Sequence, residues 1–567
     1  MIPTLQTRLA DAAAARNLEQ AGIAPLLARL FAARGIQSAD QLPGQLDKLL
    51  PPTQLMGVEQ AAVLLADAIA AGKKLLIVAD YDADGATSCA VGIKALRQMG
   101  AQVDYLVPNR FTDGYGLTPS IVNSAHQRGA DVLITVDNGI ASIEGVDEAH
   151  QLGMQVVITD HHLPGDELPK ADAIVNPNQP GCTFPSKAMA GVGVIFYVML
   201  ALRAELRNRG AFADKPEPNL SALLDLVALG TVADVARLDS NNRLLVSQGL
   251  ARLRAGRGNP GMVALLQVAG RNPAKVSATD LGFAAGPRLN AAGRMDDMGL
   301  GIACLLADNE AAAIQLAQDL DRLNRERQEI EGDMQASALA TLEQFDPGER
   351  FSLVLFEPDW HMGVIGILAS RLKDQFHRPV ITFAAGDNGE LKGSGRSISR
   401  FHLRDALDLV AKRHPGMIIR FGGHAAAAGL TLVADRLADF AAAFESVAQE
   451  WLNKSDLDQI VEIDGELLES ELTLRAAEQL EQEVWGQGFP PPLFYGEFTV
   501  AQQRVVGGNH LKLQLQANRH MVDAMLFRHN TPLPQRIHAV YRLGVNEYNG
   551  QRTAQLTLQY FEAAAPA

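Results

Sequence analysis

The chain has little of what several common protein classes depend on. Its three cysteines lie far apart and form no Cys-x-x-Cys pair, which argues against a zinc ribbon, an iron–sulfur cluster or a disulfide framework. No apolar run approaches the roughly 18 residues that a membrane-spanning helix requires. The first residues also lack the continuous apolar core of a signal peptide. We therefore expect a cytoplasmic protein with no membrane span.

An excess of positive charge is also missing. The formal net charge of −15 gives no support for nucleic-acid binding by itself. The charge is nevertheless unevenly distributed: seven basic and two acidic residues lie at 392–420, one basic and ten acidic at 456–483, and seven basic and three acidic from 498 to the end. Such segregation can create a basic groove on an acidic protein, and it is equally compatible with ordinary solvated surface.

The first half of the chain has the pattern of an α/β domain. Residues 1–50 contain apolar positions at helical spacing and predict a small helical segment packed on the main body. Short, β-branched apolar runs then alternate with helix-like segments, which predicts a parallel sheet with crossover helices, buried on both faces. The predicted strands are 75–80, 103–108, 132–137 and 155–160.

Acidic residues stand where three of these runs end, at Asp80, Asp137 and Asp160. A single Asp that closes a strand is more often a helix cap than a ligand. The carboxyl ends of parallel strands share one edge of a sheet, however, so three such residues should converge. Further potential ligands follow the first and the last of these ends: Asp82, Asp84, His161 and His162.

Carboxylates crowded in this way repel one another unless a cation lies between them. Oxygen ligands at close spacing suit hard cations such as Mg²⁺ and Mn²⁺. The sequence therefore predicts a metal site at this edge. Asp234, at the end of an apolar helix-like run over 225–235, is a further candidate ligand.

The segment GPRLNAAGRMD at 286–296 is punctuated by glycine and predicts a loop that could face phosphate through Arg288, Asn290 and Arg294. The run from about 309 to 344 contains no proline and only one glycine. Its leucine and alanine spacing and dense charge predict a long helix that connects two domains.

A second α/β pattern follows at about 350–450. There SGRS at 394–397 predicts a phosphate cradle, with Arg396 among small residues whose backbone N–H groups are free. The segment GGHAAAAG at 422–429 should let a ligand approach the backbone near His424 closely. Either motif alone is a weak signal.

After about residue 455 an acidic helical stretch gives way to about five short alternating strands, which predict a small barrel such as an OB-fold. Such a barrel could be purely structural or could mediate oligomerisation. It could instead bind a single nucleic-acid strand through aromatic and basic side chains. The candidates for that face are Phe527, Tyr541, Arg504, Lys512, Arg519 and Arg528.

These motifs together resemble a known family. DYDADG, VDNGI, TDHH and GTVADV, in that order, are similar to the motifs of the DHH phosphoesterase superfamily, and GPRLNAAGRMD, SGRS and GGHAAAAG to those of its companion DHHA1 domain. With PNRFTDGYGL at 108–117 and the terminal barrel, the chain resembles the bacterial RecJ exonucleases from about residue 50 to its end. The implied α/β multidomain organisation is a helical segment at 1–50, a parallel-sheet DHH domain at 51–305, a long connecting helix at 306–346, a smaller α/β DHHA1 domain at 347–452 and an OB-like β-barrel at 453–567.

The resemblance implies 5′→3′ hydrolysis of single-stranded DNA by two divalent cations, Mn²⁺ or Mg²⁺, in recombination and repair. It also implies cooperation with a single-stranded-DNA-binding protein and a DNA helicase, and we expect a monomer. The implied metal ligands, with Asp137 bridging the ions, are Asp80, Asp82, Asp84, Asp137, His161 and Asp234. The implied catalytic residues are Asp137, His161, His162 and His424. The expected substrate-binding residues are Arg110, Arg288, Asn290, Arg294, Ser394, Arg396, Gly423 and His424.

Three other functions stay open at this point. A phosphodiesterase or pyrophosphatase for small substrates would use the same metal cluster, although the terminal barrel would then have little purpose. A catalytically silent single-strand-binding scaffold would leave the clustered carboxylates without a use. An ordinary nucleotide-binding doubly wound protein lacks support, because no Gly-x-Gly-x-x-Gly follows a predicted strand.

Overall fold

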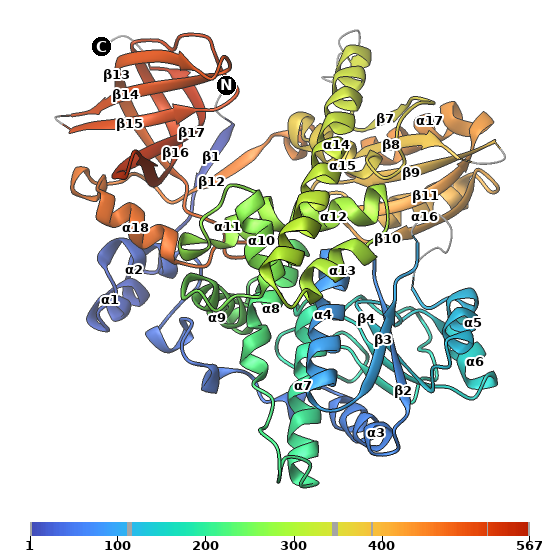
Figure 1. Cartoon of the computed structure of the whole chain (residues 1–567). Coiled ribbons are helices and arrows are strands. Elements are labelled where there is room, and N and C mark those ends of the chain that lie inside the picture. Colours follow the sequence, from blue (N-terminus) through green and yellow to red (C-terminus); the bar gives the residue numbers. More distant parts are fainter. Residues whose placement is uncertain (1–2, 110–115, 343–349, 387–388, 519, 565–567) are drawn as a thin grey trace. The chain divides into compact units, whose positions relative to one another are not determined.

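The computed structural model describes residues 3–109, 116–342, 350–386, 389–518 and 520–564. The chain forms two compact units (Figure 1). One unit contains Met1–Gln6 and Asn324–Glu462, and the other contains Thr7–Leu323 and Ile463–Ala567. Within the described residues, no helix is long and apolar enough to cross a membrane.

The larger unit contains the predicted parallel sheet, with strand order β3-β2-β4-β5-β6. All four predicted strands are confirmed, and the short β6 was not predicted. Because successive side chains alternate between the two faces, odd- and even-numbered residues of β2 enter different hydrophobic clusters. The strands are β2 (Lys74–Ala79), β3 (Gln102–Leu106), β4 (Val132–Val136), β5 (Gln155–Thr159) and β6 (Ala173–Val175).

Helices cover both faces of this sheet, which explains why its inner strands β2, β4 and β5 are mostly apolar and buried. Helices α3, α4 and α7 pack in the cluster on one face, and α5 and α6 in the cluster on the other. The helices are α3 (Val58–Ala70), α4 (Ala83–Gln98), α5 (Pro119–Gln127), α6 (Ile143–Gln151) and α7 (Gly191–Asn208).

A set of helices follows the sheet and packs into the same core as α4 and α7. A short π-helix at Leu281–Ala285 lies between α11 and α12. The helices are α8 (Leu224–Ala233), α9 (Ser240–Arg254), α10 (Pro260–Val268), α11 (Ala278–Asp280), α12 (Gly286–Met295) and α13 (Gly299–Leu306).

The predicted loop at 286–296 is wrong, because this segment is helix α12. Its glycines do not make turns: a Cβ atom on Gly293 would lie 1.8 Å from the carbonyl oxygen of Tyr81. Pro287 occupies the first turn of the helix, where the missing N–H costs nothing. The residues that suggested a loop therefore allow a helix to pack unusually closely.

The N-terminal segment is helical at α1 (Ala12–Gln20) and α2 (Pro25–Ala32), as predicted. It also contains a strand that was not predicted, β1 (Thr4–Thr7), which pairs with β12 (Ile460–Ile463). A four-residue strand carries too short a pattern to be recognised in sequence.

The predicted connecting helix is confirmed as α14 (Glu310–Leu342). The smaller unit contains a mixed sheet in the order β10-β11-β9-β8-β7, packed on a core rich in phenylalanine. Its strands are β7 (Leu353–Phe356), β8 (Val380–Ala385), β9 (Glu390–Arg396), β10 (Ile418–Gly423) and β11 (Ala427–Val433). Its helices are α15 (Ile365–Phe376), α16 (Leu403–Arg413) and α17 (Leu437–Trp451).

The C-terminal strands close into the predicted five-stranded barrel, in the order β13-β14-β15-β17-β16. Tyr541 is buried in it against Phe494 and Phe498, so its proposed place on a binding face is wrong. Phe527 is exposed, and Arg519 lies outside the described residues. The strands are β13 (Phe494–Val506), β14 (His510–Ala517), β15 (His520–Leu526), β16 (Arg536–Tyr548) and β17 (Gln551–Ala563), preceded by α18 (Leu474–Gln482).

Candidate metal centre

The three aspartates that follow β2, β4 and β5 lie side by side at the carboxyl edge of the sheet. The N–H of Asp80 donates to Val136 O at 3.3 Å, that of Asp137 to Thr159 O at 3.0 Å, and that of Asp160 to Val175 O at 3.1 Å. Each acid is thus held by the residue that ends the next strand. Sheet pairing therefore brings the acids together, as the sequence predicted.

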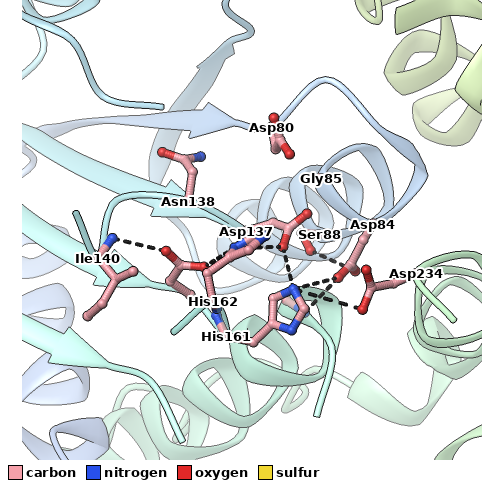
Figure 2. Close-up of polar contacts among 12 residues, drawn as sticks. Asp80, Asp84, Gly85, Ser88, Asp137, Asn138, Ile140, His161, His162 and Asp234 are labelled. Carbon is pink, nitrogen blue, oxygen red and sulfur yellow. Dashed lines mark hydrogen bonds and ion pairs between the residues drawn. The ribbon is translucent and has the colours of Figure 1, made fainter. Parts of the chain in front are cut away.

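His161 lies at the middle of the acidic cluster (Figure 2). Its Nε2 is 3.0 Å from Asp137 Oδ1, and 3.9 Å from both Asp84 Oδ2 and Asp234 Oδ2. Asp137 has a left-handed backbone, with φ of 62°, an uncommon conformation that often marks functional sites. One histidine ring thus lies near acids from the loop after β4, the first turn of α4 and the end of α8.

Asp84 is fixed at the N-terminus of α7. Its Oδ2 accepts a hydrogen bond from Gly191 N–H at 2.7 Å, and its Oδ1 one from Val192 N–H at 2.9 Å. A helix N-terminus stabilises a carboxylate through these N–H groups and the helix dipole. Sequence reasoning missed Gly191 and Val192, because nothing local marks backbone donors more than 100 residues from their acceptor.

Asp82 caps helix α4, with its Oδ1 accepting from Asp84 N–H at 2.8 Å and Gly85 N–H at 3.0 Å. A Cβ atom on Gly85 would lie 2.4 Å from the carbonyl oxygen of Asp80, so glycine lets the helix begin directly against the strand end. The DYDADG segment thus combines a strand end, a cap and a helix start, which holds three acids close together.

Asp160 orients the two histidines that follow it. Its Oδ1 accepts from the N–H of His161 at 2.7 Å and lies 2.8 Å from Nδ1 of His162, while Oδ2 accepts from Ile140 N–H at 2.9 Å. Burial would raise the pKa of Asp160, but the hydrogen bond and charge of His162 hold it below its usual value. Burial would likewise lower the pKa of His162, and Asp160 raises it to about 9.

Three carboxyl groups of the cluster hold protons more strongly than isolated aspartates. Burial, followed by the charge of Asp82, raises the pKa of Asp84 to about 7. Burial and neighbouring acids also raise the pKa of Asp137 and of Asp234 well above the usual range. Such a site is electrostatically incomplete without a cation.

Three groups of side chains have potential ligand atoms within 4.8 Å of one another: Asp137, His161 and His162; Asp84, His161 and Asp234; and Asp80, Asp82 and Asp137. Asp137 and His161 each belong to two groups, so the groups form one continuous cluster. The donors are carboxylate oxygens and imidazole nitrogens. This donor set fits Mn²⁺ or Mg²⁺.

Helix α12 borders this centre. Ala83 N–H, at the start of α4, donates to Asn290 Oδ1 at 2.8 Å, so Asn290 lies beside the acidic segment. Arg288 Nη2 is 2.7 Å from Asp321 Oδ1, and its Nη1 donates to Ala284 O at 2.7 Å. The guanidinium of Arg288 is therefore already paired with a buried acid. Arg294 is half-buried at the end of the same helix.

The remaining candidates lie in the smaller unit, except Arg110, which lies outside the described residues. Ser394 and Arg396 are in the central strand β9, which pairs with both β8 and β11. The expectation of a cradle with free N–H groups is therefore wrong, since these groups belong to a strand paired on both sides. Arg396 Nη1 instead donates to Gly395 O at 2.8 Å.

His424 is exposed in the turn between β10 and β11, and its N–H donates to Ala427 O at 2.7 Å. Gly423 has φ of 142°, and a Cβ atom there would lie 2.4 Å from Ala427 O, so glycine is required. Ala427 pairs with Arg396 in the sheet register. The turn and Arg396 therefore lie at the same end of this sheet.

Comparisons with known proteins agree with this architecture. The model of the DHH family, N-terminal domain, matches residues 74–231. The DHHA1 domain matches residues 350–450, and the RecJ OB domain matches residues 463–560. The three matches correspond to the parallel sheet and α8, to the mixed sheet, and to the barrel.

Similar proteins match over nearly the whole chain. The single-stranded-DNA-specific exonuclease RecJ of Dickeya dadantii (strain 3937) is 51% identical, covering 98% of each chain. The protein of the same name from Escherichia coli (strain K12) is 50% identical, covering 95% of this chain and 96% of its own. The crystal structure of RecJ from Thermus thermophilus in complex with Mn²⁺ has a TM-score of 0.82 and 30% identity, covering 99% of this chain and 80% of that one. The chain therefore belongs to the RecJ family.

Proposed function

We propose that this chain is a metal-dependent exonuclease that degrades single-stranded DNA from the 5′ end. The observation that carries the proposal is the cluster of buried acids around His161, which needs cations, in a chain 51% identical to a single-stranded-DNA-specific exonuclease. That a related RecJ was crystallised with Mn²⁺ and with Mg²⁺ supports the choice of metals.

Two divalent cations would be held by the six ligands Asp80, Asp82, Asp84, Asp137, His161 and Asp234. Asp137 would be the shared ligand, because it belongs to two of the three ligand groups and, unlike His161, has two oxygen atoms to offer. When bound, such ions lower the pKa of water and offset the charge that builds on the phosphodiester. Asp160 Oδ1 lies 2.8 Å from Nδ1 of His162 and holds the ring in place, so His162 could donate a hydrogen bond to a phosphate oxygen.

The proposed substrate-binding residues hold the phosphates and the 5′ end. Asn290 lies next to the acidic segment through its bond to Ala83 N–H, which supports a place beside the scissile nucleotide. His424 is exposed in its turn, which suits a contact to the scissile phosphate. The remaining members of the proposed set are Arg110, Arg288, Arg294, Ser394, Arg396 and Gly423.

We also propose domain boundaries near residues 50, 305, 346 and 452. We further propose that the chain acts as a monomer in the cytoplasm, in recombination and repair, and that it cooperates with a single-stranded-DNA-binding protein and a DNA helicase.

A digestion with Mn²⁺ tests the activity. Single strands labelled at the 5′ or the 3′ end, a duplex and a dinucleotide would be offered to the wild type and to Asp137→Ala. We expect rapid release of the 5′ label from single strands only. The substitution should lower the rate by about a thousandfold or more, ~4 kcal/mol in the barrier, because metal placement fails.

Asp166→Ala is the matched control, since Asp166 is exposed in the loop after the histidines. It should leave the rate unchanged. Release of the 3′ label first would overturn the proposed direction. Turnover of the dinucleotide alone would indicate a phosphodiesterase for small substrates, and tight binding of single strands without turnover would indicate a silent scaffold.

A further inference from the structure

The residue after Asp234 has a backbone that its side chain disfavours. Val235 is in the left-handed region, with φ of 59°. Its N–H donates to Val232 O at 3.2 Å, and Ala236 N–H donates to Thr231 O at 3.2 Å. These two bonds form a Schellman motif that ends α8, and the left-handed position of this motif is normally glycine. A β-branched residue there is a rare exception.

Packing does not compensate for this strain, because the Val235 side chain is 63% exposed. Glycine would satisfy the same backbone bonds without the steric conflict. A strained residue with a largely exposed side chain is explained when that side chain contacts something outside the folded chain. Strained positions of this kind cluster at functional sites.

Two other exposed apolar residues lie in segments that adjoin the same centre, one in sequence and one by packing. Leu163 is 63% exposed and directly follows the two histidines. The first of these, His161, has its Nε2 3.9 Å from Asp234 Oδ2. Phe283 is 83% exposed in the π-helix at Leu281–Ala285. Short π-helical turns are rare in proteins, and many of those known lie at functional sites.

The π-helix packs against the end of α8 that carries Asp234. A Cβ atom on Gly282 would lie 3.2 Å from Val232 Cγ1, and one on Gly286 would lie 3.1 Å from Ala233 Cβ. Phe283 lies between these two glycines in sequence. We call Leu163, Val235 and Phe283 the apolar rim, since each belongs to a segment that carries a proposed metal ligand or packs against such a segment.

We propose that the apolar rim contacts the bases of unpaired nucleotides at the metal centre, and that Val235 makes the most important of these contacts. This inference rests on the proposed function and adds to it a reason for single-strand specificity. The acids and cations of the centre suit the phosphate, which leaves base and deoxyribose as the parts of a nucleotide that apolar side chains can contact. Base faces are open in a single strand and stacked within a duplex, and contacts to them tolerate any sequence.

Val235→Gly separates this role from a structural one, because the two roles predict opposite changes in melting temperature. If Val235 stabilised the fold, the substitution would lower the melting temperature. Removing the strain should raise the melting temperature of the chain measured in EDTA. Removing the contact should raise KM for a 5′-phosphorylated single strand by about fivefold or more, with kcat changed less than about twofold. Val63→Ala, an exposed apolar residue on α3, is the control and should change neither quantity.

A second pair of measurements identifies the base as the contact. A strand with abasic nucleotides at its 5′ end should have a higher KM with the wild type, and a smaller increase with Val235→Gly or Phe283→Ala. Phe283→Ala keeps the test available if Val235→Gly folds poorly, since the Phe283 side chain is 83% exposed.

Three results would overturn the proposal. They are a lower melting temperature for Val235→Gly, an unchanged KM for Val235→Gly and Phe283→Ala, or an abasic strand that raises KM equally in the wild type and the variants. If the wild type degrades single strands, these results reject the apolar rim alone. If the wild type does not degrade single strands, the proposed function fails and this inference fails with it.

Discussion

At the scale of single residues, the metal centre is a site where folding and charge oppose each other. Asp84 and Asp137 are buried with Asp234 partly buried beside them, and burial with mutual repulsion raises the pKa of each. The fold holds them there through backbone bonds, such as those from Gly191 and Val192 to Asp84. The site is therefore destabilising when it is empty and ready to accept cations.

The stability of the metal-free chain should fall as pH rises from about 4, the unfolded pKa of Asp84, to about 9, the folded pKa of His162. The folded pKa of Asp84 is raised to about 7, so its contribution to stability is largest below the unfolded pKa of about 3.9 and is lost as pH rises through about 7. His162, with a folded pKa raised to about 9, changes in the same direction. Cations displace the protons and remove the repulsion.

Thermal unfolding in EDTA and in Mn²⁺ at several pH values checks this prediction. The increase in melting temperature caused by Mn²⁺ should grow with pH. Asp137→Ala should reduce that increase, since one ligand and one repelling charge are then missing. An increase that is independent of pH would contradict the assignment of these protons.

At the scale of elements, close approach of helices to strand ends builds the site. Gly85 lets α4 start against Asp80, and Gly293 lets α12 pack on the carbonyl of Tyr81, between Asp80 and Asp82. The glycines of α12 thus serve helix packing at the metal centre. This explains why a segment rich in glycine is nevertheless a helix.

Gly293→Ala should destabilise the chain by about 1 to 3 kcal/mol, because the added methyl group would lie 1.8 Å from Tyr81 O and would force α12 away from the acids. The affinity for Mn²⁺ should fall as well. Chemical denaturation and a metal titration measure the two effects.

Gly332→Ala is the matched control, since a Cβ atom on this helical glycine meets nothing within 4 Å. It should leave metal affinity unchanged and stabilise α14 by up to about 1 kcal/mol. Equal effects of the two substitutions would show that the packing of Gly293 has no special role.

At the scale of the whole molecule, the C-terminal segment that leads to the barrel is part of the larger unit, which contains the parallel sheet. Arg34, just after α2, is 2.7 Å from Asp464 Oδ1, and both side chains are buried. Trp485 and Phe489 stack on each other and contact Phe31 of α2. The barrel segment and the N-terminal helices therefore share one core, and we do not expect them to fold independently.

Arg34→Ala should lower the free energy of unfolding by about 1.5 to 3 kcal/mol, because the buried Asp464 loses one of its two arginine partners and keeps only Arg8 at 3.2 Å. Arg16→Ala, an exposed arginine on α1, should change it by less than about 0.5 kcal/mol. Denaturant unfolding followed by fluorescence measures both. A small effect of Arg34→Ala would mean that the two segments are only loosely joined.

The sequence by itself determined the parallel sheet, the long helix, the barrel and the core of the metal centre. It could do so because strand ends of a parallel sheet share one edge, so Asp80, Asp137 and His161 can be brought together by pattern alone. The family resemblance added the candidates that no local pattern links to the site, such as His424.

Only the tertiary structure decided the features that depend on partners distant in the chain. Whether Gly293 makes a turn or a close contact depends on Tyr81, and whether the N–H groups of Ser394 and Arg396 are free depends on the strands beside β9. The exposure of Val235 in a strained backbone is likewise a property of the folded chain. Local spacing encodes which residues share an edge or a face, whereas burial and close approach are decided by what the rest of the chain places against them.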